Sequence, residues 1–390
     1  MKKALHVVRS LNPKNGGTSI SVPELARATS NTGDYINYVV EFQDRGALSS
    51  RLSEHPSTGV AIEWEPIKLY LERLFPGPLS SMVEDSDIVQ IHGLWQAHCL
   101  ATSVAAAKKK KPLMISAHGM LEPWALRNKS WKKLPYSLLF ERPNLARAAC
   151  LRALTLTEAN QFRAFGLKSP IALIPNGVRV PCSVDRSIFH AEYPLLKGKR
   201  ILLFLSRIHF KKGLDILCRA WTQVHKKYPD TVLVLAGPDW EGTRAKVETL
   251  LSELQISDRV FFTGMLSGDL KWSAFAAAHA FLLPSYSEGF SMAILEALAC
   301  GLPCIITRQC NFPVVMNKCG WVIEPEVEEL KSVMCASLDQ TAQARSKFSS
   351  AARDLIQQKY TWSTVGRQMA ETYDWMLGGS IPSNTEIILN

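Results

Sequence analysis

Short apolar runs alternate with longer amphipathic runs along almost the whole chain. Short runs rich in Val, Ile and Leu suit buried strands, and apolar residues at helical spacing suit helices between them. We expect strands at residues 4–8, 38–41, 88–92, 113–117, 153–157 and 171–174, and at 201–206, 232–236, 260–263, 280–283, 304–307 and 321–323. Strands that alternate with helices form parallel sheets. The pattern therefore predicts an α/β fold with two doubly wound sheets.

This pattern breaks between residues 175 and 194, where Pro, Gly and polar residues cluster. A chain of 390 residues fits two domains of ordinary size, each with its own core. We therefore expect a first domain over residues 1–180 and a second over residues 181–362. A last amphipathic run covers residues 363–377, and the residues after it are expected to form a loose tail.

The most distinctive segment, SEGFSMAILEALACGLPCII at residues 287–306, places two carboxylates around a predicted helix start. Gly289 can take backbone angles closed to other residues, and Ser291 is a good cap for the helix that follows. The unpaired N–H groups at such a start attract anions. Glu288 precedes the start, and Glu296 falls roughly 8 Å along the helix axis. This spacing suits a phosphate at the helix start with a ribose beside Glu296.

The same segment also has a purely structural interpretation. Met292, Leu295 and Leu298 lie at helical spacing and suit the core. Gly301 followed by Pro303 is an ordinary helix stop. Two glutamates on a helix can simply be surface charges, so the residues alone leave both interpretations open.

A glycine pair, Gly16 and Gly17, stands between the first strand and the apolar-periodic run of residues 20–28. Such a pair lets backbone N–H groups approach a phosphate closely, and it also suits an ordinary tight turn. The order G-x-G-x-x-G is absent, which disfavours a nicotinamide-dependent dehydrogenase.

Two cations follow the strand expected at residues 201–206: Arg207 ends it, and Lys212 stands five residues on. Ligands gather at the carboxyl ends of strands in open α/β sheets. Arg207 and Lys212 can there offset the charge that builds on a leaving diphosphate, as a metal would. The alternative is a pair of surface cations, and Lys211 is the neighbour that we do not expect to take part.

Histidines and aromatic residues follow two successive strands of the first half. His92 and Trp95 come after the third expected strand, and His118 after the fourth, with Trp124 and Arg127 a few residues later. A lone histidine is more often structural than catalytic. At the mouth of a sheet, however, such side chains can contact a sugar.

Composition narrows the class of protein. The contents of 47% hydrophobic and 21% charged residues are those of a folded soluble protein, and no apolar run reaches the length of a membrane helix. Arg9 interrupts the first apolar run too early for a signal peptide. The nine cysteines include no C-x-x-C, and Cys300 and Cys304 lie where a helix ends and a strand begins. We interpret them as reduced, buried residues of a cytoplasmic protein.

The net charge of +10 is concentrated in the first half of the chain. Residues 1–180 hold 23 Lys and Arg against 14 Asp and Glu, a balance of +9. Much of this comes from four lysines at residues 108–111 and from an aromatic-rich stretch that contains Lys129, Lys132 and Lys133. Such stretches suit the anionic face of a membrane, and they equally suit a solvated loop. The pI of about 9.1 comes with no helix-turn-helix, RNP or zinc-finger pattern, so nucleic acid is not an expected partner.

The motif EGFSMAILEALACGLPCI, which begins at Glu288 and sets a second Glu eight positions later, is long and specific. It resembles the nucleotide-sugar site of the retaining GT-B glycosyltransferases of family 4, also called glycosyl transferases group 1. The resemblance implies a GT-B fold, in which two Rossmann-like domains face a central cleft and bind the acceptor and the donor respectively. It also implies that a C-terminal helix within residues 363–390 packs back on the first domain.

The resemblance also assigns catalytic roles. Glu288 would position the sugar hydroxyls and stabilise positive charge at the anomeric carbon, and Glu296 would bind the ribose. Arg207 and Lys212 would hold the diphosphate. His118 matches the family's active-site histidine, which contacts the transferred sugar.

Further contacts follow from the same resemblance. The glycine loop of Gly16 and Gly17 would close over the diphosphate. The remaining donor contacts would come from Gly289, from the backbone of Phe290, Ser291 and Met292, and from the base-binding loop of Gly264, Met265 and Leu266. The acceptor side would hold His92, Trp95, Trp124 and Arg127.

The implied activity is a retaining, metal-independent transfer of a hexose from a nucleoside diphosphate sugar to a saccharide. UDP-glucose is the first expected donor and GDP-mannose the second, with no cofactor. The basic first half favours a lipid-diphosphate-linked acceptor in exopolysaccharide or envelope assembly, with the protein cytoplasmic or peripheral at the inner face of the plasma membrane.

Three alternatives compete with this function. A GT-B phosphorylase would need a pyridoxal phosphate lysine, and no segment resembles one. A nucleotide-sugar-binding scaffold without turnover would not need the full set of expected catalytic residues. Asp85-Ser86-Asp87 resembles the acidic metal motif of another glycosyltransferase architecture, but Asp87 directly precedes a strand and is expected to cap its entrance.

Overall fold

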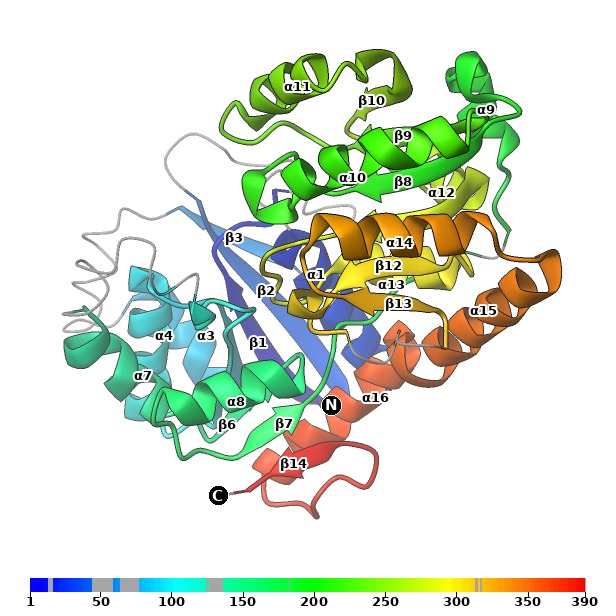
Figure 1. Cartoon of the computed structure of the whole chain (residues 1–390). Coiled ribbons are helices and arrows are strands. Elements are labelled where there is room, and N and C mark those ends of the chain that lie inside the picture. Colours follow the sequence, from blue (N-terminus) through cyan, green and yellow to red (C-terminus); the bar gives the residue numbers. More distant parts are fainter. Residues whose placement is uncertain are drawn as a thin grey trace. The chain divides into compact units, whose positions relative to one another are not determined.

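The computed structural model of the chain describes residues 1–12, 17–43, 59–63, 77–123, 126, 136–181, 183–312, 315 and 318–389. The chain divides into two compact units. Unit 1 consists of Met1–Gly177 together with Trp362–Asn390, and unit 2 consists of Val178–Thr361. In Figure 1 the chain enters unit 2 in green and returns to unit 1 in orange-red.

Unit 1 is built on an eight-stranded sheet. Its strands are β1 (Lys2–Val8), β2 (Tyr35–Gln43), β3 (Gly59–Glu63), β4 (Ile88–His92), β5 (Leu113–Ser116), β6 (Cys150–Ala153), β7 (Ile171–Leu173) and β14 (Glu386–Ile388). They lie in the order β14-β7-β6-β5-β4-β1-β2-β3, and the pairings are parallel except that of β14 with β7. Every residue of β4 is buried, as expected for a parallel strand covered on both faces.

The helices of unit 1 are α1 (Thr18–Ser30), α3 (Pro78–Glu84), α4 (Ala97–Lys108), α7 (Arg142–Ala146), α8 (Leu156–Ala164) and α16 (Trp362–Met376). Although α16 is the last helix of the chain, it lies against α1 (Figure 1). Val365, Met369 and Tyr373 form its buried stripe. Gly366 permits the close approach, because a Cβ there would lie 2.4 Å from the carbonyl oxygen of Ala28.

Unit 2 contains a six-stranded parallel sheet in the order β10-β9-β8-β11-β12-β13. Its strands are β8 (Arg200–Leu205), β9 (Thr231–Ala236), β10 (Val260–Gly264), β11 (Ala278–Leu283), β12 (Cys304–Thr307) and β13 (Gly320–Ile323). Its helices are α9 (Ser187–Glu192), α10 (Leu214–Lys227), α11 (Thr243–Glu253), α12 (Gly268–Ala277), α13 (Met292–Ala299), α14 (Val327–Leu338) and α15 (Ala342–Leu355).

The packing of α10 shows how the apolar pattern builds this core. Leu214, Leu217, Trp221 and Val224 recur at helical spacing, and all four are buried. Trp221 is fully buried, and its indole N–H donates to the carbonyl oxygen of Arg259 at 3.0 Å. Helix α10 also packs beside α14 over one face of the sheet (Figure 1).

Two expectations about strands were wrong. The strand expected at residues 153–157 lies at Cys150–Ala153, because Thr155 instead caps α8 by accepting a hydrogen bond from the N–H of Glu158. Arg152 concealed this strand in the sequence, since a charged residue argues against a buried position. The C-terminal tail is also not loose: Glu386–Ile388 forms β14 on the edge of the unit 1 sheet, and the carbonyl oxygen of Ile388 accepts from Arg163.

The described cysteines are free thiols, with Cys304 buried and Cys300 partly buried. Within the described ranges, no helix has the length and apolar character needed to cross a membrane.

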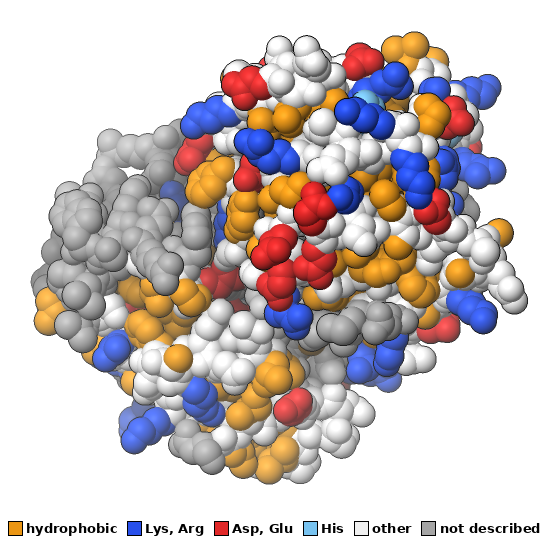
Figure 2. Space-filling view, viewed as in Figure 1, with side chains coloured by type: hydrophobic (Ala, Val, Ile, Leu, Met, Phe, Trp, Pro, Cys, Tyr) orange, Lys and Arg blue, Asp and Glu red, His pale blue; other side chains and the backbone are white. Residues whose placement is uncertain are grey.

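Figure 2 shows acidic side chains gathered where β13 leads into α14, a segment that carries Glu324 and Glu328. Both pair with nearby cations, Glu324 with Arg308 and Glu328 with Lys331. Such pairs fit the small net charge of residues 181–390, which hold 22 Lys and Arg against 21 Asp and Glu.

Candidate functional site

The carboxyl ends of neighbouring strands in unit 2 bring several of the expected donor residues to one edge of the sheet. Arg207 and Lys212 follow β8, Glu288 follows β11, and the residues after β12 pack against Glu288. These three strands are adjacent in the order β8-β11-β12. In open α/β sheets this edge is where ligands bind.

A buried ion pair forms the centre of this edge. The ammonium nitrogen of Lys212 lies 2.5 Å from Oε1 of Glu288, and each side chain is 10% exposed. The same carboxylate oxygen accepts from the hydroxyl of Ser285 at 2.7 Å. Burial raises the pKa of Glu288, but the positive charge of Lys212 and these hydrogen bonds outweigh it and hold the pKa below its ordinary value. Glu288 is therefore a carboxylate at neutral pH.

The backbone on both sides fixes this ion pair. A turn of 3-10 helix at Phe210–Lys212 ends at Gly213, whose φ of +68° begins α10. A Cβ on Gly213 would lie 2.0 Å from the carbonyl oxygen of Pro284, so glycine is needed at this point. On the other side, the side-chain amide of Asn311 donates to the carbonyl oxygen of Glu288 at 2.6 Å.

Arg207 lies in a different environment from Lys212. Its side chain is exposed, and its guanidinium lies 4.6 Å from the ring centre of Trp240. The two expected diphosphate cations are thus one buried, paired lysine and one exposed arginine stacked on an aromatic ring. The sequence had not singled out Trp240.

Helix α13 begins at the expected place, but one expected detail is wrong. Ser291 occupies the N-cap position, yet its side chain makes no capping hydrogen bond. Gly289 and Met292 are half-buried, and Phe290 packs against Phe312 with ring centres 5.1 Å apart. The backbone N–H groups of the first turn have no partner within the helix, so they can donate to an anion.

Glu296 has a partner that sequence spacing could not reveal. Its Oε1 lies 2.6 Å from the ammonium nitrogen of Lys271 on α12, and the side chains are 15% and 22% exposed respectively. A ribose that binds Glu296 would therefore share the carboxylate with Lys271. Because the two residues are 25 positions apart on different helices, only the packing of α12 beside α13 brings them together.

The expected base-binding loop follows β10. The carbonyl oxygen of Gly264 accepts from the N–H of Gly237 at 2.7 Å. Met265 is 56% exposed, whereas the side chain of Leu266 is buried in the core. Any contact that Leu266 makes with a ligand must therefore come from its backbone.

In unit 1, three histidines from adjacent parallel strands form a line across the sheet. His6 lies on β1, His92 ends β4, and His118 follows β5. Nδ1 of His6 lies 3.0 Å from Nε2 of His92, and Nδ1 of His92 lies 3.1 Å from Nε2 of His118. His118 is half-buried with a φ of +53°, a left-handed conformation that is uncommon outside glycine.

This arrangement changes the expected part of His92. The side chain was expected to contact a sugar, but the residue is 2% exposed and both ring nitrogens face other histidines. It is placed to support His118 instead. His6 was missed in the sequence because a single histidine inside the first strand carries no signal of its own.

The three rings are held neutral. Burial lowers the pKa of His118 to about 3 and that of His6 to about 4, and it lowers that of His92 well below its ordinary value. The cation that adds to this effect is Arg152, which is fully buried on β6. Its guanidinium donates to the carbonyl oxygens of Ile174 and Pro175 at 3.0 and 2.7 Å.

The other residues expected in unit 1 are only partly accounted for. Trp95 is half-buried, and its indole N–H donates to the carbonyl oxygen of Met120 at 3.4 Å. Gly17 is exposed at the start of α1, where its carbonyl oxygen accepts from the N–H of Ser21. Gly16, Trp124 and Arg127 lie outside the described residues.

Asp87 has the structural role that its position predicts. It accepts from the N–H of Lys3 at 2.7 Å and donates its own N–H to the carbonyl oxygen of Lys3, which joins the entrances of β4 and β1. Among the residues that the structure describes, no group of three His, Cys, Asp or Glu side chains is placed to hold a metal ion.

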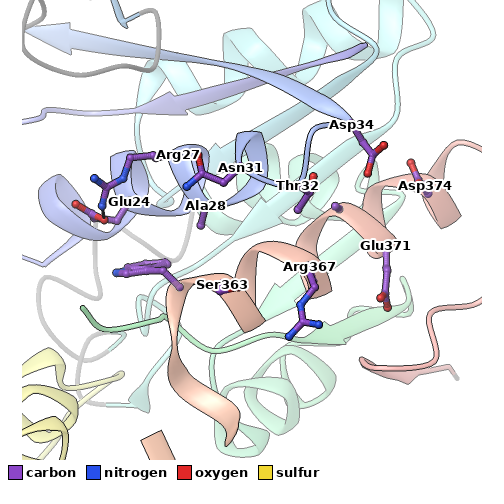
Figure 3. Close-up of a pocket in the computed structure, with 12 residues that line it drawn as sticks. Glu24, Arg27, Ala28, Asn31, Thr32, Asp34, Ser363, Arg367, Glu371 and Asp374 are labelled. Atoms are coloured by element: carbon purple, nitrogen blue, oxygen red, sulfur yellow. Dashed lines mark hydrogen bonds and ion pairs between the residues drawn. The ribbon is translucent and has the colours of Figure 1, made fainter. Parts of the chain in front are cut away.

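A polar groove of about 480 Å³ lies between α1 and α16 and is lined by none of the expected site residues (Figure 3). The side chains of Glu24 and Arg27 lie together on α1, and Arg367 and Glu371 come from α16. Asp374, at one end, already accepts from Lys2 and from the hydroxyl of Tyr35. Glu24, Arg27 and Asp374 therefore already have partners within unit 1.

Comparison with known proteins supports the arrangement found in both units. A family model described as glycosyltransferase family 4 matches residues 15–180, and one described as glycosyl transferases group 1 matches residues 185–355. One component of the phosphatidylinositol N-acetylglucosaminyltransferase of Homo sapiens is 30% identical over 207 residues, 52% of this chain and 42% of that protein. A GDP-mannose-dependent phosphatidylinositol monomannoside mannosyltransferase of Corynebacterium glutamicum is 25% identical over 330 residues, 79% of this chain and 83% of that protein. The chain spans less than half the length of the first of these relatives.

Solved structures share the fold of the whole chain. The HepE protein of Anabaena, solved in complex with UDP and glucose, has a TM-score of 0.79 and 21% identity over 96% of this chain and 100% of that one. Sucrose-phosphate synthase of Thermosynechococcus elongatus has a TM-score of 0.75 and 19% identity over 97% of this chain and 100% of that one. The two family models cover most of the chain in consecutive order, and the fold is GT-B. The chain belongs to the family 4 glycosyltransferases, group 1.

Proposed function

We propose that the protein transfers a hexose, with retention of configuration, from a nucleoside diphosphate sugar to a saccharide acceptor. The observation that carries the proposal is the buried Lys212–Glu288 pair, at the carboxyl ends of β8 and β11 and just before α13. It combines a cation for a diphosphate, a carboxylate for a sugar and the N–H groups of a helix start. Such a combination suits the transition state of glycosyl transfer.

The diphosphate would be held in unit 2. The ammonium group of Lys212 has three N–H donors, so its bond to Glu288 leaves others for a phosphate oxygen. Arg207 and the N–H groups at the start of α13 would supply further positive potential. We propose that these cations replace a metal ion in stabilising the leaving group.

The sugar and ribose would be held by the two glutamates. Glu288, kept ionised by Lys212, would accept from sugar hydroxyls and stabilise positive charge at the anomeric carbon. The acceptor hydroxyl would attack on the face from which the diphosphate leaves, and a leaving phosphate oxygen would take its proton. No enzyme nucleophile is then needed. Glu296 would accept from the ribose beside Lys271.

UDP-glucose is our first proposed donor and GDP-mannose the second. The Anabaena protein has been solved with UDP-glucose, whereas the Corynebacterium relative is named as GDP-mannose-dependent.

We propose a lipid-linked saccharide as the acceptor, contacted by unit 1 at the inner face of the plasma membrane, in exopolysaccharide or envelope assembly. The names of several relatives include phosphatidylinositol or inositol phosphate, and the excess charge of +9 in residues 1–180 favours an anionic surface. The basic stretch with Lys129, Lys132 and Lys133 lies outside the described residues. Replacing Lys129, Lys132 and Lys133 by alanine should weaken binding of the protein to phosphatidylglycerol vesicles at low salt. If the native chain does not bind such vesicles, the proposed membrane association is refuted.

A thermal-shift screen of nucleotide sugars, with and without EDTA, tests the function directly. One nucleoside diphosphate hexose should raise the melting temperature equally in both conditions. Hydrolysis or transfer of that donor should be lost in Glu288→Gln, while the free nucleotide still binds. If the donor binds but is never turned over with any acceptor or water, a scaffold without turnover is the correct alternative.

A further inference from the structure

The line of histidines in unit 1 continues through a fourth residue. Nε2 of His6 lies 2.8 Å from Oδ1 of Asn37 on β2, whose side-chain NH₂ donates to the hydroxyl of Ser30 at 2.9 Å. Asn37, His6, His92 and His118 thus form one row of hydrogen bonds across β2, β1, β4 and β5. All but His118 are at most 2% exposed.

The donor at each link of this row is fixed once its first link is known. A neutral imidazole carries one N–H and one lone pair, so a ring that donates at one nitrogen must accept at the other. Because Asn37 presents its carbonyl oxygen, His6 donates from Nε2 and accepts at Nδ1. His92 must then donate from Nε2 to His6, and His118 must donate from Nε2 to His92.

The same assignment leaves one lone pair for a ligand. With its Nε2–H committed to His92, His118 carries no proton on Nδ1. The reverse chain would require protonation of a ring beside the buried cation Arg152, or an Asn37 amide turned so that its NH₂ faces His6. The charged or titratable groups next to the row are Arg152, Tyr373 and, behind Arg152, Glu158.

We propose that Asn37 acts through His6 and His92 to fix His118 as a hydrogen-bond acceptor at Nδ1, so that it recognises a hydroxyl of the sugar. Asn37, His6 and His92 are positioning residues. The recognition of a sugar rests on the proposed function, whereas the tautomer is a property of the chain alone. A hydroxyl donates to this nitrogen, but a fluorine in its place cannot.

The tautomer can be measured in the full chain by long-range ¹H–¹⁵N correlation spectra of ¹⁵N-histidine protein. His118→Gln and His6→Gln variants assign two of the nine histidines by the signals that disappear. We expect His118 to show an unprotonated Nδ1 and a protonated Nε2, unchanged between pH 8 and pH 5.5. A protonated Nδ1 at His118 in the native chain would overturn the proposal, whatever any variant does.

A matched pair of variants tests the part played by Asn37. Asn37→Leu removes the anchor, so His118 should show a mixture of both tautomers, whereas Asn31→Leu, at an exposed position at the end of α1, should leave the native spectrum. An unchanged His118 signal in folded Asn37→Leu would show that Asn37 does not fix the tautomer of His118. If Asn37→Leu does not fold, His6→Phe breaks the same row at its next link and is read in the same way.

Donor analogues test what His118 recognises. Nucleoside diphosphate hexoses with single hydroxyls replaced by fluorine are compared with the parent sugar for binding to native protein and to His118→Phe. At one ring position, fluorine should weaken native binding about tenfold and leave the variant unaffected. Equal binding of every analogue would refute the recognition. Failure of all nucleotide sugars to bind would refute the proposed function and the recognition together, while the tautomer is still decided by the spectra.

Discussion

Replacing Lys212 by methionine should destabilise unit 2 in a way that depends strongly on pH. Methionine keeps most of the buried side-chain volume and removes the positive charge. Glu288 is then left buried, with a hydrogen bond from the Ser285 hydroxyl and the weaker influence of the Lys211 charge. The variant therefore isolates the electrostatic part of the pair.

The size of the effect follows from the geometry. Two unit charges 2.5 Å apart attract by about 7 kcal/mol at an effective dielectric constant of about 20, before the desolvation of both groups is subtracted. Breaking a buried pair by removing one partner typically costs about 3–5 kcal/mol. The loss has an upper limit, because Glu288 can take up a proton instead. At pH 7.5 this costs about 4 kcal/mol for a carboxyl whose ordinary pKa is about 4.3.

The sign of the pH dependence is determined by Glu288. In the native chain its folded pKa lies below the ordinary value, so its stabilising contribution is present above about pH 4.5 and is lost only at lower pH. Without Lys212, burial dominates and the folded pKa rises above the ordinary value. The variant should therefore lose about 4 kcal/mol at pH 7.5 and about 1 kcal/mol near pH 4.5.

The assay is urea unfolding, with hydrogen exchange of peptides from β11 and β12 as the readout. It measures the loss of stability of unit 2 separately from that of unit 1, which matters because two units need not unfold together. Lys211→Met is the matched control, since it makes the same change one residue away, and it should cost under about 1 kcal/mol. Equal losses for the two variants, or a Lys212→Met loss that is the same at both pH values, would refute the reasoning.

Three further predictions concern glycine, the ribose carboxylate and the histidines. Gly213→Ala should lower stability by at least about 2 kcal/mol more than Gly242→Ala in thermal unfolding, since both have a φ of +68° and begin a helix but only the first meets a carbonyl oxygen. Glu296→Gln should weaken binding of the donor's nucleoside diphosphate at least tenfold, as measured by calorimetry, and Lys271→Met should weaken it less. Equal effects of the two variants would show that the Lys271–Glu296 ion pair, and not Glu296 by itself, binds the ribose. Because His6 has a folded pKa of about 4, the unfolded chain binds more protons than the folded chain below pH 6.5. The free energy of unfolding should therefore fall by about 2 kcal/mol between pH 6.5 and pH 5 through the protonation of His6 alone. His6→Phe should reduce this pH dependence in denaturant titrations.

Local patterns predicted most of the parallel strands of both units, because strands buried on both faces read as continuous apolar runs. The parallel strand β3 at Gly59–Glu63 was not expected from the sequence. Strand β4 and strand β12 were placed at their observed bounds. The strand β6 was misplaced because it contains a buried charge, Arg152, whose guanidinium donates to backbone carbonyls more than 20 positions away. Strand β14 was missed because it is a short edge strand that needs β7 beside it.

The sequence by itself determined the family, the α/β fold and the identity of the residues at the strand ends, because these depend on periodicity and on a long contiguous motif. Only the tertiary structure decided which groups are paired. Lys212 with Glu288, Lys271 with Glu296, and the row from Asn37 to His118 each join residues that are distant in the chain. Charge state and tautomer depend on burial and on the neighbour across the sheet, and neither is a property of a residue's place in the sequence.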